Sequence, residues 1–199
     1  MRAPAPILIS AASALLLLAC GNERATPPDL DRLGRPGPTE EFVNPGAVSF
    51  RHPRSWHALA ATPPQYATLA SGGALAAVYA YPRTDLGTDP ASVEASRRRL
   101  INSLRLRDPG FLIERSELTE VDGAPAVELR GRGTIAGRAV ETRALHVYKP
   151  EVEWVIDAYA SPGKFAQANR IAFGLLLETI ELDEDPPELS PRGDGEEAG

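Results

Sequence analysis

The central part of the chain opens with a strand-like pattern of apolar positions. Val48 and Phe50 alternate with polar residues, which predicts a strand that ends at the turn-forming residues 52–55. Residues 66–69 and 74–81 flank a Ser-Gly-Gly sequence, and this arrangement predicts a β-hairpin. Every position of 74–81 is apolar or aromatic, so we expect this strand to lie inside a sheet with both faces covered.

A helix is predicted after the hairpin. Asp89 and Pro90 are typical of a helix start, because an acidic cap accepts backbone hydrogen bonds and proline needs no donor in the first turn. The apolar positions that recur at helical spacing are Val93, Leu100, Ile101 and Leu104. The rest of this helix carries Arg97, Arg98, Arg99, Arg105 and Arg107. We interpret these arginines as a solvated face; the alternative is an anionic partner such as lipid headgroups or a cell-wall polymer.

The second half of the central region predicts an antiparallel meander. Strands are expected over 111–121, around 127–129, and over 138–149 and 152–160, with tight turns between them. Ser161 and Pro162 predict the start of a second helix, and residues 177–182 either extend it or form a last short strand. The order of strands, helix, strands and helix predicts an α+β fold, an antiparallel β-sheet with helices packed on it.

The two ends of the chain differ from this domain, which we place at residues 47–183. Residues 1–19 contain one Arg and then an apolar stretch shorter than the roughly 20 residues that span a bilayer, which predicts an export signal peptide. Residues 20–46 are polar and rich in proline, which predicts a flexible tether. Residues 184–199 are acidic and almost without apolar side chains, which predicts a disordered tail.

Cys20 is the sole cysteine and stands directly after the apolar stretch. Leu17-Leu18-Ala19-Cys20 resembles the lipobox of bacterial lipoproteins. The resemblance implies that a diacylglycerol is attached to the Cys20 sulfur and that the chain is cleaved before Cys20, often with acylation of the new amino terminus. Two or more acyl chains give stable anchoring, so we expect an extracytoplasmic protein held to the membrane by lipid. The alternative is a plain secretory signal with an incidental cysteine.

Charge argues against one class of partner. The formal net charge is −6, and it becomes −7 once residues 1–19 are removed, because Arg2 is their only charged residue. Residues 181–199 hold eight carboxylates against one arginine and so carry −7. The charges of residues 20–180 therefore balance to zero. A neutral domain with an acidic tail is a poor candidate for nucleic acid, whose binding depends on a basic surface. We therefore predict no nucleic-acid partner.

Histidine spacing and the single cysteine argue against a metal site. A lone cysteine cannot form an intramolecular disulfide or a CxxC pair. His52, His57 and His146 lack the spacing of a metal motif such as HxxxH. We expect His52 and His57 at a turn and a strand edge, whereas His146 shares strand parity with Thr142 and can line a pocket. No metal ligand and no cofactor are predicted.

No known catalytic motif occurs in the chain. A G-x-S-x-G nucleophile elbow is absent, and Gly131-Arg132-Gly133 lacks the helix that a phosphate loop needs, so we interpret these glycines as hairpin residues. Asp157 lies in an apolar strand, where alternation predicts that it faces solvent; if buried, it needs a partner. We predict no catalytic residue. The alternative is a hydrolase that uses His146 with Asp157.

Four short motifs in order resemble the Mog1/PsbP-like fold, an α/β/α sandwich that includes actinobacterial lipoproteins of the LpqN type. They are Phe50-x-x-Pro53-x-x-Trp56, Val121-Asp122-Gly123-Ala124-Pro125-Ala126, the aromatic strand 154–159, and the helix from Phe165 to the closing Thr179-Ile180-Glu181-Leu182. The resemblance implies a mainly non-catalytic role, because relatives act as assembly factors, regulators or binders and some are linked to envelope lipids. It supplies no ion-binding residue that matches this chain.

Together these patterns predict a membrane-anchored accessory or binding module of the cell envelope. Its partner is expected to be another envelope protein or a lipid-like, amphiphilic ligand. Two alternatives stay open, namely an envelope hydrolase of unknown substrate and a structural spacer, and the spacer predicts a domain without a cleft.

Overall fold

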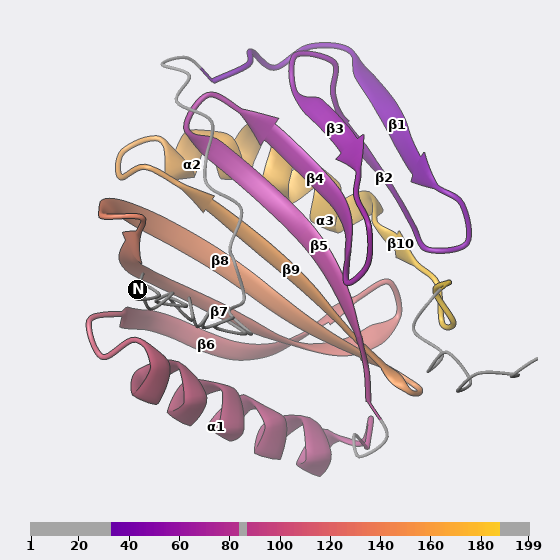
Figure 1. Cartoon of the computed structure of the whole chain (residues 1–199), viewed down its shortest axis with the longest axis vertical. Coiled ribbons are helices and arrows are strands. Elements are labelled where there is room, and N and C mark those ends of the chain that lie inside the picture. The colour runs from indigo at the N-terminus through magenta and orange to yellow at the C-terminus, as the bar shows by residue number, and fades with distance from the viewer. Residues whose placement is uncertain (1–32, 84–86, 188–199) are drawn as a thin grey trace, which may run out of the picture.

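The computed structural model describes residues 33–83 and 87–187 and arranges them in two antiparallel sheets (Figure 1). In spatial order the large sheet contains β3 (His57–Ala60), β4 (Gln65–Ser71), β5 (Ala74–Pro82), β9 (Val152–Ala160), β8 (Arg138–Lys149), β7 (Ala124–Ile135) and β6 (Leu112–Val121). The small sheet contains β1 (Thr39–Asn44), β2 (Val48–Pro53) and β10 (Glu181–Leu182).

Helices cover both faces of the large sheet. On one face α1 (Pro90–Arg107) packs across β6 and β7. On the other face lie α2 (Phe165–Ala168), a π-helical turn η1 (Asn169–Phe173) and α3 (Gly174–Thr179), which also contacts β2. The predicted α+β class, an antiparallel sheet with helices packed on it, is confirmed.

The main core lies between the large sheet, the C-terminal helices and the small sheet. Trp56 and Phe173 meet edge to face with ring centroids 5.6 Å apart, and both side chains are almost fully buried. A second, smaller core lies under α1, where Val93 and Leu104 pack with Val127 of β7. Both apolar residues of α1 belong to the face that the helical spacing predicted.

Local signals in the sequence position these elements. Asp89 caps α1, since its Oδ1 accepts hydrogen bonds from the backbone N–H groups of Ala91 at 3.0 Å and Ser92 at 3.2 Å. Asp122 and Gly123 have φ values of 50° and 69°, the left-handed conformations that a two-residue hairpin turn requires. The predicted helix start and this hairpin are confirmed.

The folded region begins before residue 47. Residues 39–44, which we assigned to the tether, form β1 and pair with β2. The ring of Phe42 stacks on Phe50 with centroids 4.9 Å apart, so one aromatic side chain joins this short strand to the core. The tether prediction is therefore wrong for residues 39–44, whereas residues 1–32, with the predicted signal peptide and Cys20, lie outside the described part.

The second helix begins later than predicted. Residues 161–163 form a turn in which the backbone N–H of Lys164 donates to the carbonyl of Ser161 at 3.0 Å, and α2 starts at Phe165 without a side-chain cap. Gly163 has a φ of 81°, which a right-handed helix cannot contain. Residues 177–182 are divided between the two predicted outcomes, the end of α3 and the strand β10.

The chain stays packed on the domain after residue 183. The indole N–H of Trp154 donates to the Asp183 carbonyl at 3.0 Å, and the Tyr66 hydroxyl donates to the Pro187 carbonyl at 2.5 Å. Disorder was therefore the wrong prediction for residues 184–187, because the carbonyls of Asp183 and Pro187 hold this segment at both ends to aromatic side chains of the core. Residues 188–199 lie outside the described part.

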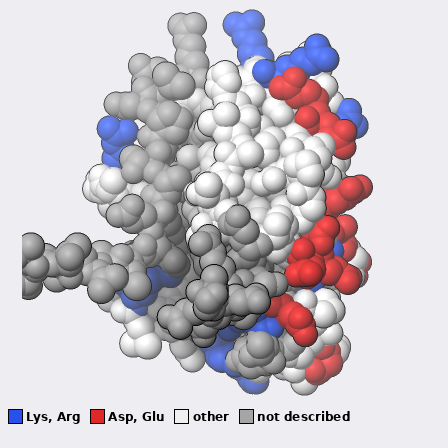
Figure 2. Space-filling model, turned by 45° about the vertical axis from the view of Figure 1, so that its right-hand side comes forward, with Lys and Arg blue, Asp and Glu red and all other residues white. Residues whose placement is uncertain are grey.

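One margin of the domain carries no charge. From Ser55 to Pro82 the chain contains no Lys, Arg, Asp or Glu, and this stretch forms β3, β4 and β5. Figure 2 shows a broad uncharged area with acidic side chains along one border. Of the helices in the described ranges, none has the length and apolar character needed to cross a membrane.

Candidate functional site

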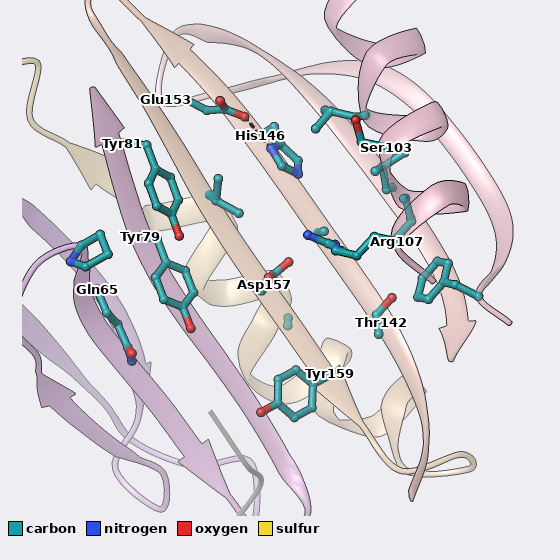
Figure 3. A pocket seen from close by; sticks show the side chains of 18 of the residues that line it. Gln65, Tyr79, Tyr81, Ser103, Arg107, Thr142, His146, Glu153, Asp157 and Tyr159 are labelled. Carbon is teal, nitrogen blue, oxygen red and sulfur yellow. Dashed lines mark hydrogen bonds and ion pairs between the residues drawn. The ribbon is translucent and has the colours of Figure 1, made fainter. Parts of the chain in front are cut away.

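A cavity of about 620 Å³ opens on the sheet face that carries α1 (Figure 3). Strands β5, β9 and β8 form its floor, α1 forms one wall, and the β4–β5 side forms the other. Its apolar wall contains Leu100 and Leu104 of α1, Phe111 just before β6, and Leu129 of β7.

Strand register decides which side chains share the floor. In the register of β8 with β9, Ala144 is opposite Asp157 and His146 is opposite Val155. Opposite residues share a face, and so do alternate residues of one strand, so His146 and Asp157 lie on the same face of the sheet. Asp157 is half-buried and lines the cavity, so the prediction that it faces solvent is wrong. Alternation placed Asp157 on the correct face of β9. That face is not open to bulk solvent, however, because α1 and the β4–β5 side enclose the space above it. His146 lines the cavity, the position that its strand parity allowed.

A buried carboxylate occupies one end of the cavity. Glu153 is 2% exposed, and its Oε1 lies 2.6 Å from Nδ1 of His146, while its Oε2 pairs with the guanidinium of Arg83. Burial by itself raises the pKa of Glu153, but the hydrogen bond from His146 and the charges of His146 and Arg83 hold the pKa below its ordinary value. Glu153 is therefore ionised at neutral pH, with both oxygens occupied.

Two tyrosines line the side of the cavity opposite α1. The rings of Tyr79 and Tyr81 stack with centroids 6.3 Å apart and an interplanar angle of 15°. Burial, together with the charges of Asp157 and Glu153, raises the pKa of Tyr81, so its hydroxyl stays protonated at neutral pH. This side therefore offers flat apolar surface with hydroxyl groups at its edge.

Arg107 enters the cavity from the last turn of α1. Figure 3 shows its side chain extending over the sheet between His146 and Thr142. Within residues 33–83 and 87–187 no carboxylate forms an ion pair with Arg107. The arginine face predicted for this helix is thus mainly exposed, and one member of it lines the cavity.

The remaining sequence candidates lie away from the cavity. His52 is buried in β2 beside the Pro53 carbonyl, at 3.0 Å from its Nδ1, and His57 is exposed on the edge strand β3. Gly131 lies inside β7 rather than at a turn. A glycine fits this position because the ring of Phe111 packs where a Cβ would stand. The described residues contain no group of three or more His, Cys, Asp or Glu placed to hold a metal ion.

Comparison with solved structures identifies the architecture. No protein-family model and no curated protein matches the sequence. The cyanobacterial PsbP protein CyanoP from Synechocystis sp. PCC 6803 superimposes with a TM-score of 0.53 at 10% identity, over 83% of this chain and 98% of CyanoP. The chain has the PsbP-like fold.

A second structural neighbour is a mycobacterial protein. LpqN of Mycobacterium tuberculosis, described as involved in cell envelope biogenesis, superimposes with a TM-score of 0.51 at 17% identity, over 73% of this chain and 91% of LpqN. At these identities the likeness concerns the fold.

The short motifs that resembled this fold have structural roles here. Phe50 and Trp56 of the opening motif are 1% exposed and belong to the main core. The hydroxyl of Thr179, in the closing motif, accepts a hydrogen bond from the backbone N–H of Arg51 at 2.9 Å, which joins the two motifs. Neither motif lines the cavity of this PsbP-like domain.

Sequence analysis missed the residues that give the cavity its charge. Arg83 and Glu153 were not singled out, and Arg107 was named only as one of five arginines on its helix, although Arg83 lies two residues after Tyr81 on the same side of the cavity. The available signal was a set of polar or aromatic residues with the same parity in two apolar segments. In the segment of β5 and the residue after it they are Tyr79, Tyr81 and Arg83, and in that of β9 they are Glu153, Asp157 and Tyr159.

Proposed function

We propose that this chain is a non-catalytic binding module of the cell envelope whose cavity holds an amphiphilic ligand. The observation that carries the proposal is the cavity itself. Its volume of about 620 Å³ falls within the roughly 300–1,000 Å³ typical of small-molecule sites, and it combines apolar walls with a few convergent polar groups. A spacer without a binding role would not need such a cleft.

The distribution of side chains supports an amphiphile rather than a wholly polar ligand. Leu104, Leu129 and Phe111 present aliphatic and aromatic surface on the α1 side, where a hydrocarbon chain gains by leaving water. Charged groups lie at the cavity end and floor, where Arg83 and Glu153 face each other. A ligand with an apolar body and one polar group matches this division.

The contacts of His146 support binding rather than hydrolysis. Its Nδ1 pairs with Glu153 and not with Asp157, the partner that the hydrolase alternative required. Among the described residues, no serine or threonine hydroxyl is hydrogen-bonded to His146, so no activated nucleophile accompanies the ring. A ring fixed in this way can orient a bound polar group.

A place in the envelope follows from the sequence and is part of the proposal. The export signal, Cys20 and the proline-rich segment predict a lipid anchor with a tether, and the fold is shared with the envelope protein LpqN. An anchored domain with an amphiphile site would hold or present its ligand next to the membrane.

Native mass spectrometry of the full chain tests the proposal. Ala144 lies in the cavity floor, and Ala144→Phe places a ring in the ligand space. Ala139→Phe is the matched control, because Ala139 is exposed on the same strand. We expect the parent and Ala139→Phe proteins to carry a small bound amphiphile and Ala144→Phe to lose it. Equal ligand content in all three, or a ligand-free parent, would refute the proposal.

A further inference from the structure

Two basic side chains approach the middle of the cavity from different elements. Arg107 reaches over the sheet from α1, and His146 rises from β8 (Figure 3). We infer that the ligand is an amphiphile with a carboxylate head group, bound between Arg107 and His146 with its apolar chain along Leu104 and Leu129. The inference rests on the proposed function and specifies the ligand of the same cavity.

Arg107 is set apart by its position and contacts. Elsewhere on α1, Arg97 is held by Glu94 with a shortest N–O distance of 2.7 Å, and Arg99 donates to the Ser96 hydroxyl at 3.0 Å. Arg107 has no such contact with the described residues and projects over the cavity. A guanidinium presents a planar set of donors that matches a carboxylate, so a bound carboxylate would complete its hydrogen bonds.

The second donor comes from His146. Since its Nδ1 faces the ionised Glu153 at 2.6 Å, that nitrogen carries a proton and donates to Glu153. The other ring nitrogen, Nε2, is left for the cavity. In the proposed complex the ring bridges Glu153 and the ligand carboxylate, with one N–H toward each.

The other charged groups of the cavity show which head group is disfavoured. Arg83 and Glu153 offset each other's charge within their ion pair. Asp157 lies between the small side chains of Ala77 and Ala144 in neighbouring strands, and its charge opposes an anion. A cationic head group would be attracted by Asp157 but repelled by Arg107. A carboxylate can accept from the guanidinium of Arg107 and from the ring of His146, which favours the carboxylate ligand.

Calorimetric titration of the full chain with three eight-carbon probes tests the inference. Octanoate, octylammonium and octanol share one alkyl chain and differ in head-group charge. At neutral pH we expect octanoate to bind about tenfold tighter than octanol, the effect of one good charge-assisted hydrogen bond. Octylammonium is expected to bind more weakly than octanol.

Three variants assign the preference to residues. Arg107→Gln is expected to weaken octanoate binding about tenfold and to change octanol binding far less. Arg105→Gln is the matched control, because Arg105 is exposed in the same helical turn and does not line the cavity, and we expect no change. Asp157→Asn removes the opposing charge, so octanoate binding is expected to tighten.

The possible outcomes separate the two levels of the proposal. Tighter binding of octylammonium, with loss of binding in Asp157→Asn, would overturn the carboxylate inference and leave the binding cavity intact. Equal effects of Arg107→Gln and Arg105→Gln would also overturn it. If the parent protein binds none of the three probes, the proposed function itself fails.

Discussion

Glu153→Gln is the substitution that most sharply tests the charged end of the cavity. Glutamine keeps the shape of the side chain but removes the charge that pairs with Arg83 and His146. Glu153 is 2% exposed, so water cannot replace the lost interactions at its own position. The surrounding packing is retained, and the change therefore isolates the electrostatic contribution.

The expected magnitude follows from the exposure of the partners. A hydrogen bond to a charged group contributes roughly 1.5–3 kcal/mol, and Glu153 makes contacts of this kind with both partners. The side chain of Arg83 is 39% exposed and recovers hydration when its partner is removed, which reduces the loss. We expect a destabilisation of about 2 kcal/mol, or a fall in Tm of about 4–8 °C for a chain of this size.

Urea denaturation of the full chain measures this loss. Glu117→Gln is the control, because Glu117 forms a more exposed pair with Arg115, and pairs of this kind contribute about 0–1 kcal/mol. Since folding lowers the pKa of Glu153, its ionised form stabilises the protein fully above the ordinary pKa of 4.5, and this contribution is lost as pH falls through the folded value. The difference between parent and Glu153→Gln must therefore shrink below pH 4.5. Equal stability of both variants at pH 7, or a difference that grows in acid, would refute the reasoning.

Two further substitutions test the framework around the cavity. Gly131→Ala would place a Cβ 2.4 Å from a backbone carbonyl oxygen and 2.5 Å from the ring of Phe111. We expect the free energy of unfolding in urea to fall by about 1–3 kcal/mol. Gly110→Ala is the control and should be close to neutral, because the nearest atom to its new Cβ is 3.5 Å away. Lys149→Met removes an ammonium group that donates to the Leu182 carbonyl at 2.5 Å; faster amide hydrogen exchange confined to residues 181–187 is expected, and unchanged exchange there would contradict the role of this contact.

Local signals allowed much of the fold to be predicted. The Asp89 cap and the Asp122-Gly123 turn depend on residues adjacent in sequence, and both were predicted correctly. Strand β1 was missed because its stability comes from pairing with β2 and from Phe42 on Phe50, rather than from a pattern within residues 39–44. The turn at Gly163 was missed because Ser-Pro before an apolar helix is also a common helix start.

The site was less predictable because it depends on register and on helix placement. Strand parity indicated that His146 can line a pocket, but it does not give its partner, and only the pairing of β8 with β9 brings Glu153 beside it. Arg107 was one of five similar arginines on a helix. Its position over the cavity follows from the way α1 crosses the sheet, which no local pattern encodes.

The most direct test of the binding cavity is a crystal structure of the full chain grown with octanoate. We predict electron density for the ligand on the α1 side of the sheet, with the alkyl chain against Leu104 and Leu129 and the carboxylate within hydrogen-bonding distance of Arg107. Crystals of Ala144→Phe grown in the same way should show the new ring in that space and no ligand. An empty cavity in the parent protein at saturating octanoate, or a ligand bound only at another surface, would contradict the proposal.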